Sequence, residues 1–189
     1  MAKITENLLV KGARGNLGKQ YVYKTRGSRT YIARMPVVNK DAVPTEKQSE
    51  VRESFGEASM YAQGAMSSPD LKKQYEKKAT DGSTAFNIAF RDFLKPPVVK
   101  SIATGKYDGT PGSIIVVKAK DDFRVVEVKV SIRTADGVLV EEGNAVLNPI
   151  NRNSWDYTAS QTNASPPGSI ITATAVDLPG NEGTLEKTM

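Results

Sequence analysis

Residues 124–133 read Arg-Val-Val-Glu-Val-Lys-Val-Ser-Ile-Arg, and this stretch decides the fold of the second half of the chain. From residue 126 onward every second side chain is apolar, and the side chains between them are Glu, Lys, Ser and Arg. Such alternation has the period of a β-strand with one buried face. We therefore expect one inner wall of a β-structure to be formed by Val126, Val128, Val130 and Ile132.

Similar short runs fill residues 97–189, with turn signals such as Ala135-Asp136-Gly137 and Pro179-Gly180-Asn181 between them. Seven short strands of this kind are typical of a β-sandwich. We expect them at residues 98–103, 113–120, 124–133, 138–147, 154–160, 169–177 and 184–187.

Helical periodicity governs the residues before this region. Thr45 and Gln48 have the spacing of a capping box, which predicts a helix that runs to about residue 67. One face of this helix should carry Val51, Phe55, Ala58 and Ala62. A second helix should begin at Ser68-Pro69, and a third, capped by Ser83 or Thr84, should pack its apolar residues 86–94 as a core.

The first 36 residues have a different pattern. Residues 1–17 show no sustained periodicity and are rich in glycine, so we expect an extended arm. Residues 19–36 alternate on both sides of Arg26-Gly27-Ser28-Arg29, which predicts a β-hairpin.

The net charge of the chain changes sign at about the residue where helical periodicity gives way to strand alternation. Residues 1–96 carry 17 basic and 10 acidic side chains, whereas residues 97–189 carry 9 and 11. The first 40 residues hold nine basic side chains and one acidic side chain, so this region should seek an acidic surface. We place a domain boundary at Lys95-Pro96-Pro97, between residues 1–96 and 97–189.

Two absences exclude whole classes of chemistry. The sequence contains no Cys and no His, which removes disulfides, thiolate nucleophiles, imidazole bases and Cys/His metal sites. Residues 12–19 are not a phosphate-binding P-loop, because Ala13 and Gln20 replace the required Gly and Ser or Thr. We expect no enzyme activity, no cofactor, no metal and no small-molecule substrate.

Three groups of carboxylates have a second interpretation. Asp121-Asp122 and Asp177 with Asn181 lie in predicted turns, where calcium or local hydrogen bonding are the alternatives. Glu141-Glu142 would act as an acid/base pair only in a cleft, and we expect a solvated strand end instead.

The C-terminal half resembles bacterial immunoglobulin-like domains. The residues that carry the resemblance are Trp155-Asp156-Tyr157-Thr158 and, after a loop, Ile171-Thr172-Ala173-Thr174-Ala175-Val176-Asp177-Leu178-Pro179-Gly180-Asn181. The resemblance covers roughly residues 97–189 and implies a Greek-key sandwich used as a spacer, adhesive or assembly module. The N-terminal half resembles uncharacterised bacterial proteins with a Gly-rich basic hairpin, seen at Gly15–Tyr23 and Tyr31–Pro36, and a capped helix at Thr45–Gln48. No activity follows from that second resemblance.

The expected fold is therefore α+β: a basic arm and β-hairpin, a small helical subdomain and a C-terminal immunoglobulin-like β-sandwich. The expected function is a structural subunit that assembles with copies of itself into a filament, tube or phage-like particle. In this hypothesis the arm adds as a strand to the sheet edge of a neighbouring copy. The anchoring side chains would be Ile4, Leu8, Leu9 and Val10.

The alternative is a nucleic-acid-binding protein, because the hairpin interleaves aromatic and cationic side chains. The residues of this candidate site are Lys19, Tyr21, Tyr23, Lys24, Arg26, Arg29, Tyr31 and Arg34. Blunting of an exposed strand edge by Lys and Arg is the competing explanation for the same pattern.

The N-terminus has no secretion signal and no segment reaches the length of a membrane span. We expect cytoplasmic synthesis without a signal peptide, with release or export only as part of an assembly, and no membrane partner.

Overall fold

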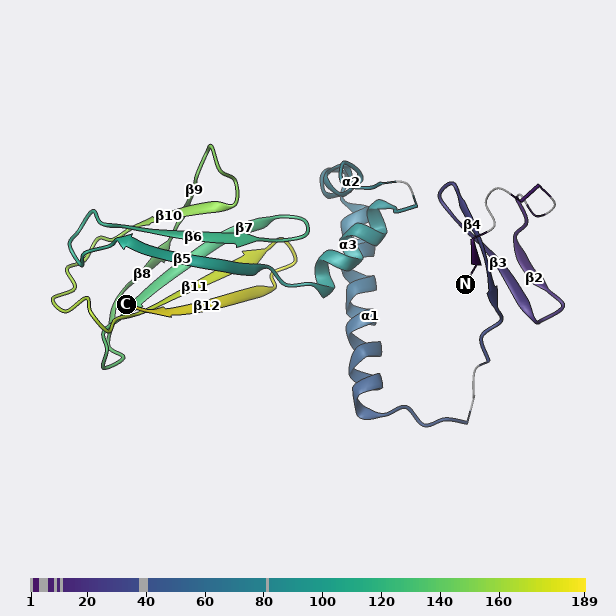
Figure 1. Ribbon diagram of the computed structural model, residues 1–189, viewed down its shortest axis with the longest axis horizontal. Helices are drawn as coiled ribbons and strands as arrows, with labels where there is room; N and C mark the ends of the chain where they lie inside the picture. Colours follow the sequence, from purple (N-terminus) through teal and green to yellow (C-terminus); the bar gives the residue numbers. More distant parts are fainter. Residues whose placement is uncertain (1, 4–6, 9, 11, 38–40, 81) are drawn as a thin grey trace. The chain divides into compact units, whose positions relative to one another are not determined.

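The computed structural model describes the whole chain except residues 1, 4–6, 9, 11, 38–40 and 81. The described residues form three helices and three antiparallel sheets, a mixed α and β architecture (Figure 1). They fall into two compact units, Met1–Arg91 and Asp92–Met189, and helix α3 (Ala85–Leu94) contributes residues to both. The division between residues 96 and 97 that the charge pattern indicated stays a prediction.

A four-stranded sheet begins the first unit. Its order is β1-β4-β3-β2, and its strands are β1 (Ala2–Lys3), β2 (Gly15–Leu17), β3 (Tyr21–Arg26) and β4 (Arg29–Arg34). Strands β3 and β4 form the predicted hairpin. Gly27 occupies its turn with a φ of 57°, a backbone conformation that two-residue hairpin loops require.

The prediction of an extended arm over residues 1–17 is wrong for the described part of that segment. Both β1 and β2 pair with the hairpin of the same chain, one on each edge. Between them the Val10 amide donates to the Asn7 carbonyl at 3.2 Å, and the Ala13 amide donates to the Val10 carbonyl at 3.0 Å. The physical reason is that an isolated hairpin is marginally stable and leaves unpaired backbone groups along both edges.

Local capping sets the helix starts. Helix α1 (Glu46–Ser67) has the predicted capping box: Thr45 Oγ1 accepts from the Gln48 amide at 3.3 Å, and Gln48 Oε1 accepts from the Thr45 amide at 3.1 Å. Helix α2 (Pro69–Glu76) begins at the predicted proline, although the Ser68 side chain makes no capping hydrogen bond. Helix α3 is capped by Thr84, whose hydroxyl accepts from the Asn87 amide at 3.3 Å.

All the buried residues of α1 lie in its second half. Its buried residues are Ala58, Ala62 and Ala65, and Tyr75 of α2 is buried with its hydroxyl 2.8 Å from that of Tyr61. Residues 46–57 are exposed on every face of the helix. On the predicted apolar face, Ala58 and Ala62 are therefore buried, whereas Val51 and Phe55 are exposed. No helix of the described residues combines the length and apolar character needed to cross a membrane.

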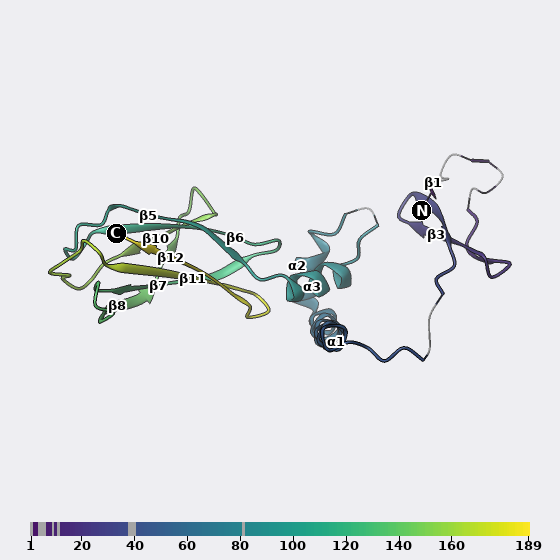
Figure 2. The same cartoon turned by 60° about the horizontal axis from the view of Figure 1, so that its bottom comes forward.

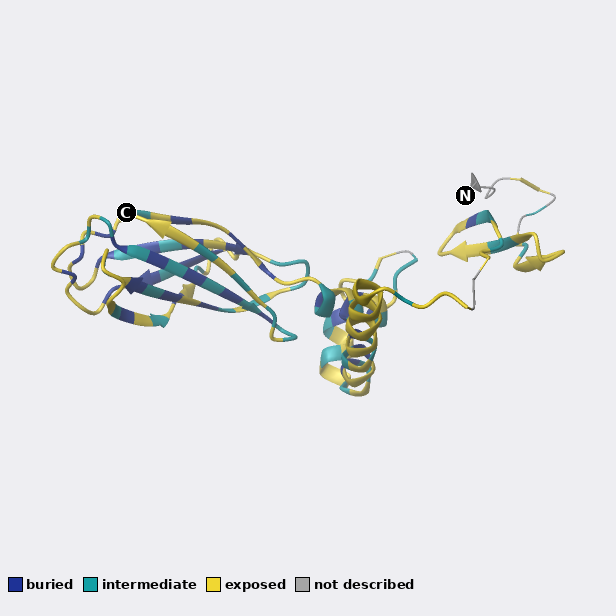
Figure 3. Ribbon diagram, turned by 90° about the horizontal axis from the view of Figure 1, so that it is seen from below, coloured by how far each residue is buried: buried dark blue, intermediate teal, exposed yellow. Residues whose placement is uncertain are grey.

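The second unit, which is described in full, holds two four-stranded sheets with the orders β5-β6-β10-β9 and β12-β11-β7-β8 (Figure 2). The strands are β5 (Val98–Lys106), β6 (Ile114–Lys120), β7 (Val125–Arg133), β8 (Leu139–Asn144), β9 (Val146–Leu147), β10 (Ser154–Thr158), β11 (Ile170–Asp177) and β12 (Glu182–Thr188). Buried residues from both sheets, among them Ile115, Val117, Val130 and Ile171, form one core. Buried and exposed residues alternate along the strands, which is consistent with a β-sandwich (Figure 3).

The predicted inner wall on β7 is confirmed at three of its four positions. Val128, Val130 and Ile132 are fully buried, whereas Val126 is 41% exposed. The pairing of β7 with β11 shifts register between Val176 and Asp177. This bulge reverses the side chains beyond it, so the alternation of the sequence does not continue to Val126.

The predicted strand at residues 138–147 is two strands. β8 pairs with β7 and β9 pairs with β10, so the chain passes from one sheet to the other at the buried Ala145. The sequence of the stretch does not reveal the crossing, because the crossing is defined by distant pairing partners, β7 for β8 and β10 for β9.

Glu141 corrects the prediction that Glu141-Glu142 is a solvated strand end. The Glu141 side chain is buried, and its Oε2 accepts from the Ser160 amide at 2.8 Å, the Ser160 hydroxyl at 2.9 Å and the Gln161 amide at 3.2 Å. Glu142 is exposed and forms an ion pair with Lys129 at 3.2 Å. Glu141 thus ties β8 to the chain that follows β10.

We predict that Glu141→Ala destabilises the fold and that Glu142→Ala does not. Loss of the Glu141 carboxylate leaves two amides and a hydroxyl without their acceptor, which should lower the free energy of unfolding by about 2 kcal/mol. The exposed Glu142 pair should contribute about 0.5 kcal/mol or less. Urea denaturation of both variants measures the difference, and equal decreases would contradict this role of Glu141.

Candidate functional site

The candidate binding residues of the hairpin lie on two opposite faces. Directly paired residues of antiparallel strands lie on the same face, and Lys24 pairs with Tyr31 while Arg26 pairs with Arg29. These four side chains therefore share one face, which we call the cationic face. The structure brings together four of the eight predicted residues there.

The other predicted residues lie elsewhere on the sheet. Tyr21 pairs with Arg34 and Tyr23 pairs with Ile32, so they occupy the opposite face. Lys19 lies in the turn between β2 and β3, where its φ of 57° is the one positive value for a non-glycine residue in the described chain. The aromatic and cationic residues that alternate in the sequence are therefore separated in the structure. Two of the three tyrosines, Tyr21 and Tyr23, lie on the face opposite to Lys24, Arg26 and Arg29.

A cavity of about 430 Å³ opens against the cationic face. The hairpin contributes Arg26, Arg29 and Tyr31 to its lining, and the α2–α3 loop and α3 contribute Thr80, Ser83 and Arg91. Among the described lining residues three are arginines and none is acidic. Asp81, the chain neighbour of Thr80, lies outside the described residues.

A close backbone contact holds the hairpin turn against the α2–α3 loop. Arg26 Nε donates to the Gly82 carbonyl at 3.2 Å. Gly82 has a φ of 78°, and a Cβ there would lie 3.0 Å from Arg26 Cγ and 3.4 Å from the Gly27 amide nitrogen. Glycine is therefore required both by its backbone conformation and by the close approach of the hairpin.

Sequence reasoning missed the contributions of Thr80, Ser83 and Arg91. Arg91 lies in a helix whose sequence predicts an apolar core. Thr80 and Ser83 are residue types that are common in helix caps and turns, so neither suggested a binding site. The contact of Gly82 with the hairpin turn helps to bring these residues to the cationic face. The dipeptide Asp81-Gly82 is typical of turns, and it is a sequence signal of a special backbone conformation at this point.

The predicted self-association residues are only partly described. Leu8 is 89% exposed, and Val10 is half-buried within the turns that follow it. Ile4 and Leu9 lie outside the described residues. Their role as anchors for a neighbouring copy stays a prediction.

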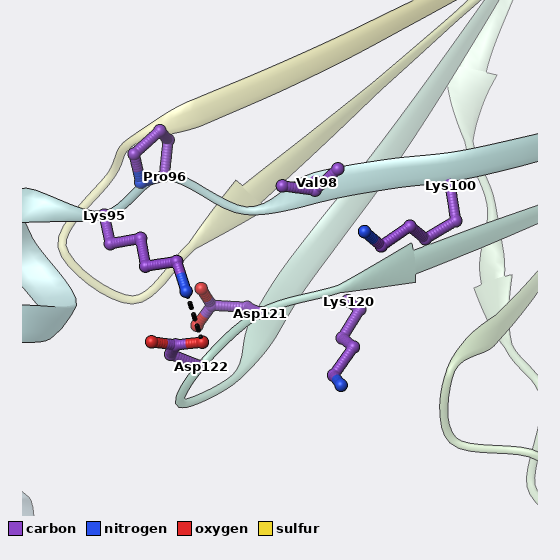
Figure 4. Close-up of a pocket in the computed structure, with 7 residues that line it drawn as sticks. All are labelled: Lys95, Pro96, Val98, Lys100, Lys120, Asp121 and Asp122. Carbon is purple, nitrogen blue, oxygen red and sulfur yellow. Dashed lines mark hydrogen bonds and ion pairs between the residues drawn. The ribbon is translucent and has the colours of Figure 1, made fainter.

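The paired aspartates Asp121 and Asp122 lie between β6 and β7 and make contacts within the second unit. Asp121 Oδ2 accepts from the amides of Phe123 and Arg124 at 2.9 and 2.8 Å, and Asp122 pairs with Lys95 at 2.8 Å. A cavity of about 140 Å³ lies beside them, lined also by Lys100 and Lys120 (Figure 4). No cluster of three carboxylates suited to a metal ion occurs within the described residues.

Asp177 and Asn181 form a latch between the β11–β12 turn and the end of α3. Asp177 Oδ1 accepts from the amides of Gly180 and Asn181 at 2.9 and 2.6 Å. The Asn181 side chain donates to Asp177 Oδ2 at 2.8 Å and to the Phe93 carbonyl at 3.0 Å. Burial raises the pKa of the Asp177 carboxyl, and the hydrogen bonds from Asn181 and Gly180 oppose this effect only in part.

The raised pKa of Asp177 predicts that this residue stabilises the fold more at acidic pH than at neutral pH. The folded chain binds the Asp177 proton more tightly than the unfolded chain does. The free energy of unfolding should therefore increase as pH falls from neutrality toward 3.8, the ordinary pKa of an Asp carboxyl. Asp177→Asn removes this contribution. The stability of the natural chain relative to Asp177→Asn should therefore increase as pH falls, measured by urea denaturation at several pH values. A difference between the two proteins that is independent of pH would contradict the assignment.

No family model and no curated protein matches the chain. Among solved structures, CopC from Methylosinus trichosporium OB3b is similar over 49% of this chain and 91% of its own, with 17% sequence identity and a TM-score of 0.34. An engineered protein is similar over 58% of this chain and 29% of its own, with 17% identity and a TM-score of 0.30. Likenesses this weak carry no argument about the fold family or the function of this chain.

Proposed function

We propose that this chain is a non-enzymatic structural subunit that assembles with copies of itself into a filament, tube or phage-like particle. The observation that carries the proposal is the exposure of apolar side chains in the first unit. Seven of the described large apolar side chains are more than half exposed: Leu8, Leu17, Val37, Val43, Val51, Phe55 and Met60. Exposed apolar side chains that gather in one region mark surfaces that another protein covers.

Helix α1 supplies the clearest part of this surface. Its first three turns, residues 46–57, have no buried residue, although Val51 and Phe55 continue the face that Ala58 and Ala62 bury. Phe55 makes one edge-on ring contact with Phe90, with centroids 5.2 Å apart, and is still 52% exposed. A helix of this length gains most of its stability in water from packing an apolar face, which favours a partner for this half of α1.

The N-terminal segment supplies the second part. Leu8 projects from the turns between β1 and β2, and its 89% exposure suits an anchor in a neighbouring copy. The described structure favours a change in the predicted mechanism: the anchor is a loop between two edge strands rather than a free arm.

The acceptor in this proposal is the edge strand β8. On the opposite side of the sandwich the edges β5 and β12 approach each other: Lys187 Nζ donates to the Ile102 carbonyl at 3.0 Å, and a Cβ at Gly183 would collide with the Pro97 carbonyl. β8 is the longer of the two remaining sheet edges. The opposite net charges of the two halves favour contacts between the first half of one copy and the second half of the next. Such a contact builds a fibre when it does not close on itself.

We also propose that the sandwich is immunoglobulin-like. The order β5-β6-β10-β9 corresponds to the A-B-E-D sheet of that fold, and β12-β11-β7 corresponds to its G-F-C strands, with β8 as an added edge. One hallmark is different: Trp155 lies on β10 rather than on the strand equivalent to C, and the chain has no cysteines to form a disulfide against it. The strand order supports the resemblance of the sequence without the features specific to antibody domains.

The proposal predicts that charge at the exposed anchors prevents assembly. Leu8→Glu and Val51→Glu should each shift the natural chain from oligomers toward monomer, because a buried unpaired carboxylate is costly in an interface. Light scattering after size exclusion, over a range of protein concentrations, measures the mass. Ile150→Glu is the matched control, since Ile150 is 94% exposed on the second unit. A natural chain that stays monomeric at every concentration would contradict the proposal.

A further inference from the structure

The arginine-lined cavity beside the hairpin is a built feature of the first unit. Arg26 and Arg29 are directly opposite each other at the end of the hairpin, and Arg26 is fixed by its hydrogen bond to the Gly82 carbonyl. Arg91 reaches the same cavity from α3. The hydroxyl-bearing residues Thr80 and Ser83 complete a lining that is rich in hydrogen-bond donors.

This gathering of like charges favours an anion in the cavity. Two like charges directly opposite on paired strands are destabilising, and Arg26 and Arg29 are such a pair. An anionic ligand between these side chains would replace the repulsion between the arginines with attraction to the ligand. Guanidinium groups are the side chains best suited to phosphate, because their planar donors form paired hydrogen bonds with its oxygens.

The cationic face also extends beyond the cavity. Lys24 is exposed on the same face as Arg26 and Arg29, two residues along the strand from Arg26. The cross-strand partner of Lys24 is Tyr31, which lines the cavity and is half-buried. A row of cations with an aromatic ring beside it fits a chain of phosphates with unstacked bases, so single-stranded nucleic acid is favoured over an acidic protein surface.

The geometry points to a binding site for single-stranded nucleic acid on the cationic face, in which Arg29, Arg91 and the neighbouring hydroxyls contact a phosphate and Tyr31 stacks on a base. Arg26 mainly positions the hairpin against the α2–α3 loop. This site is separate from the proposed self-association surface, which lies on Leu8 and the first turns of α1. A subunit that assembles would carry it on every copy.

The test is fluorescence anisotropy of the full chain with a labelled oligothymidylate of about 20 nucleotides, at about 50 and about 200 mM salt. We expect binding that weakens as salt increases. Arg29→Gln with Arg91→Gln should reduce affinity on the order of tenfold and should lower the salt slope by about 0.7 for each phosphate that is no longer neutralised. The matched control is Arg124→Gln with Arg152→Gln, which removes the same charge from exposed positions of the second unit.

Two further measurements keep the result decisive. Arg29→Gln alone, at an exposed strand end, should retain the circular dichroism spectrum of the natural chain and still bind more weakly. Unlabelled oligothymidylate should displace the probe at lower concentration than polyglutamate of similar length. The inference is overturned if the natural chain does not bind, if the control is weakened as much as the double variant, or if polyglutamate competes equally well.

Discussion

Antiparallel pairing of β3 and β4 is the constraint on which the candidate site depends. The register sets Lys24 opposite Tyr31 and Arg26 opposite Arg29, and side chains of directly paired residues lie on the same face. A strand shifted by one residue would present its cations on the other face. The contact of Gly82 with the turn then presents this face to α3, so register and a single glycine together create the arginine-lined cavity.

The same period of two residues organises the sandwich, but there burial decides which face is occupied. Val128, Val130 and Ile132 enter the core because this face of β7 packs with buried residues of the other sheet, such as Ile115 and Val117. On the hairpin the cationic face is not packed into such a core, and three of its side chains, Arg26, Arg29 and Tyr31, line a cavity. The two units thus share one backbone pattern, which packs a core in the second unit and lines a cavity in the first.

Local signals in the sequence predicted local structure well. The Thr45 capping box, the hairpin turn and most strands could be predicted because they depend on residues close together in the chain. The β7 bulge, the passage from β8 to β9 and the burial of Glu141 could not, since each depends on partners far away in sequence. For the site, the cations of the hairpin could be predicted, but neither their separation from two tyrosines nor the contribution of Arg91. These follow only from strand register and the packing of one loop.

The register of the hairpin is therefore the most direct test, and a chain without natural cysteines suits it. Lys24→Cys with Tyr31→Cys should form an intramolecular disulfide under mild oxidation, because directly paired residues have the separation that a disulfide needs. Lys24→Cys with Ile32→Cys should stay reduced, since those side chains lie on opposite faces. Efficient cross-linking of the second pair and not the first would show a different register and would contradict the cationic face.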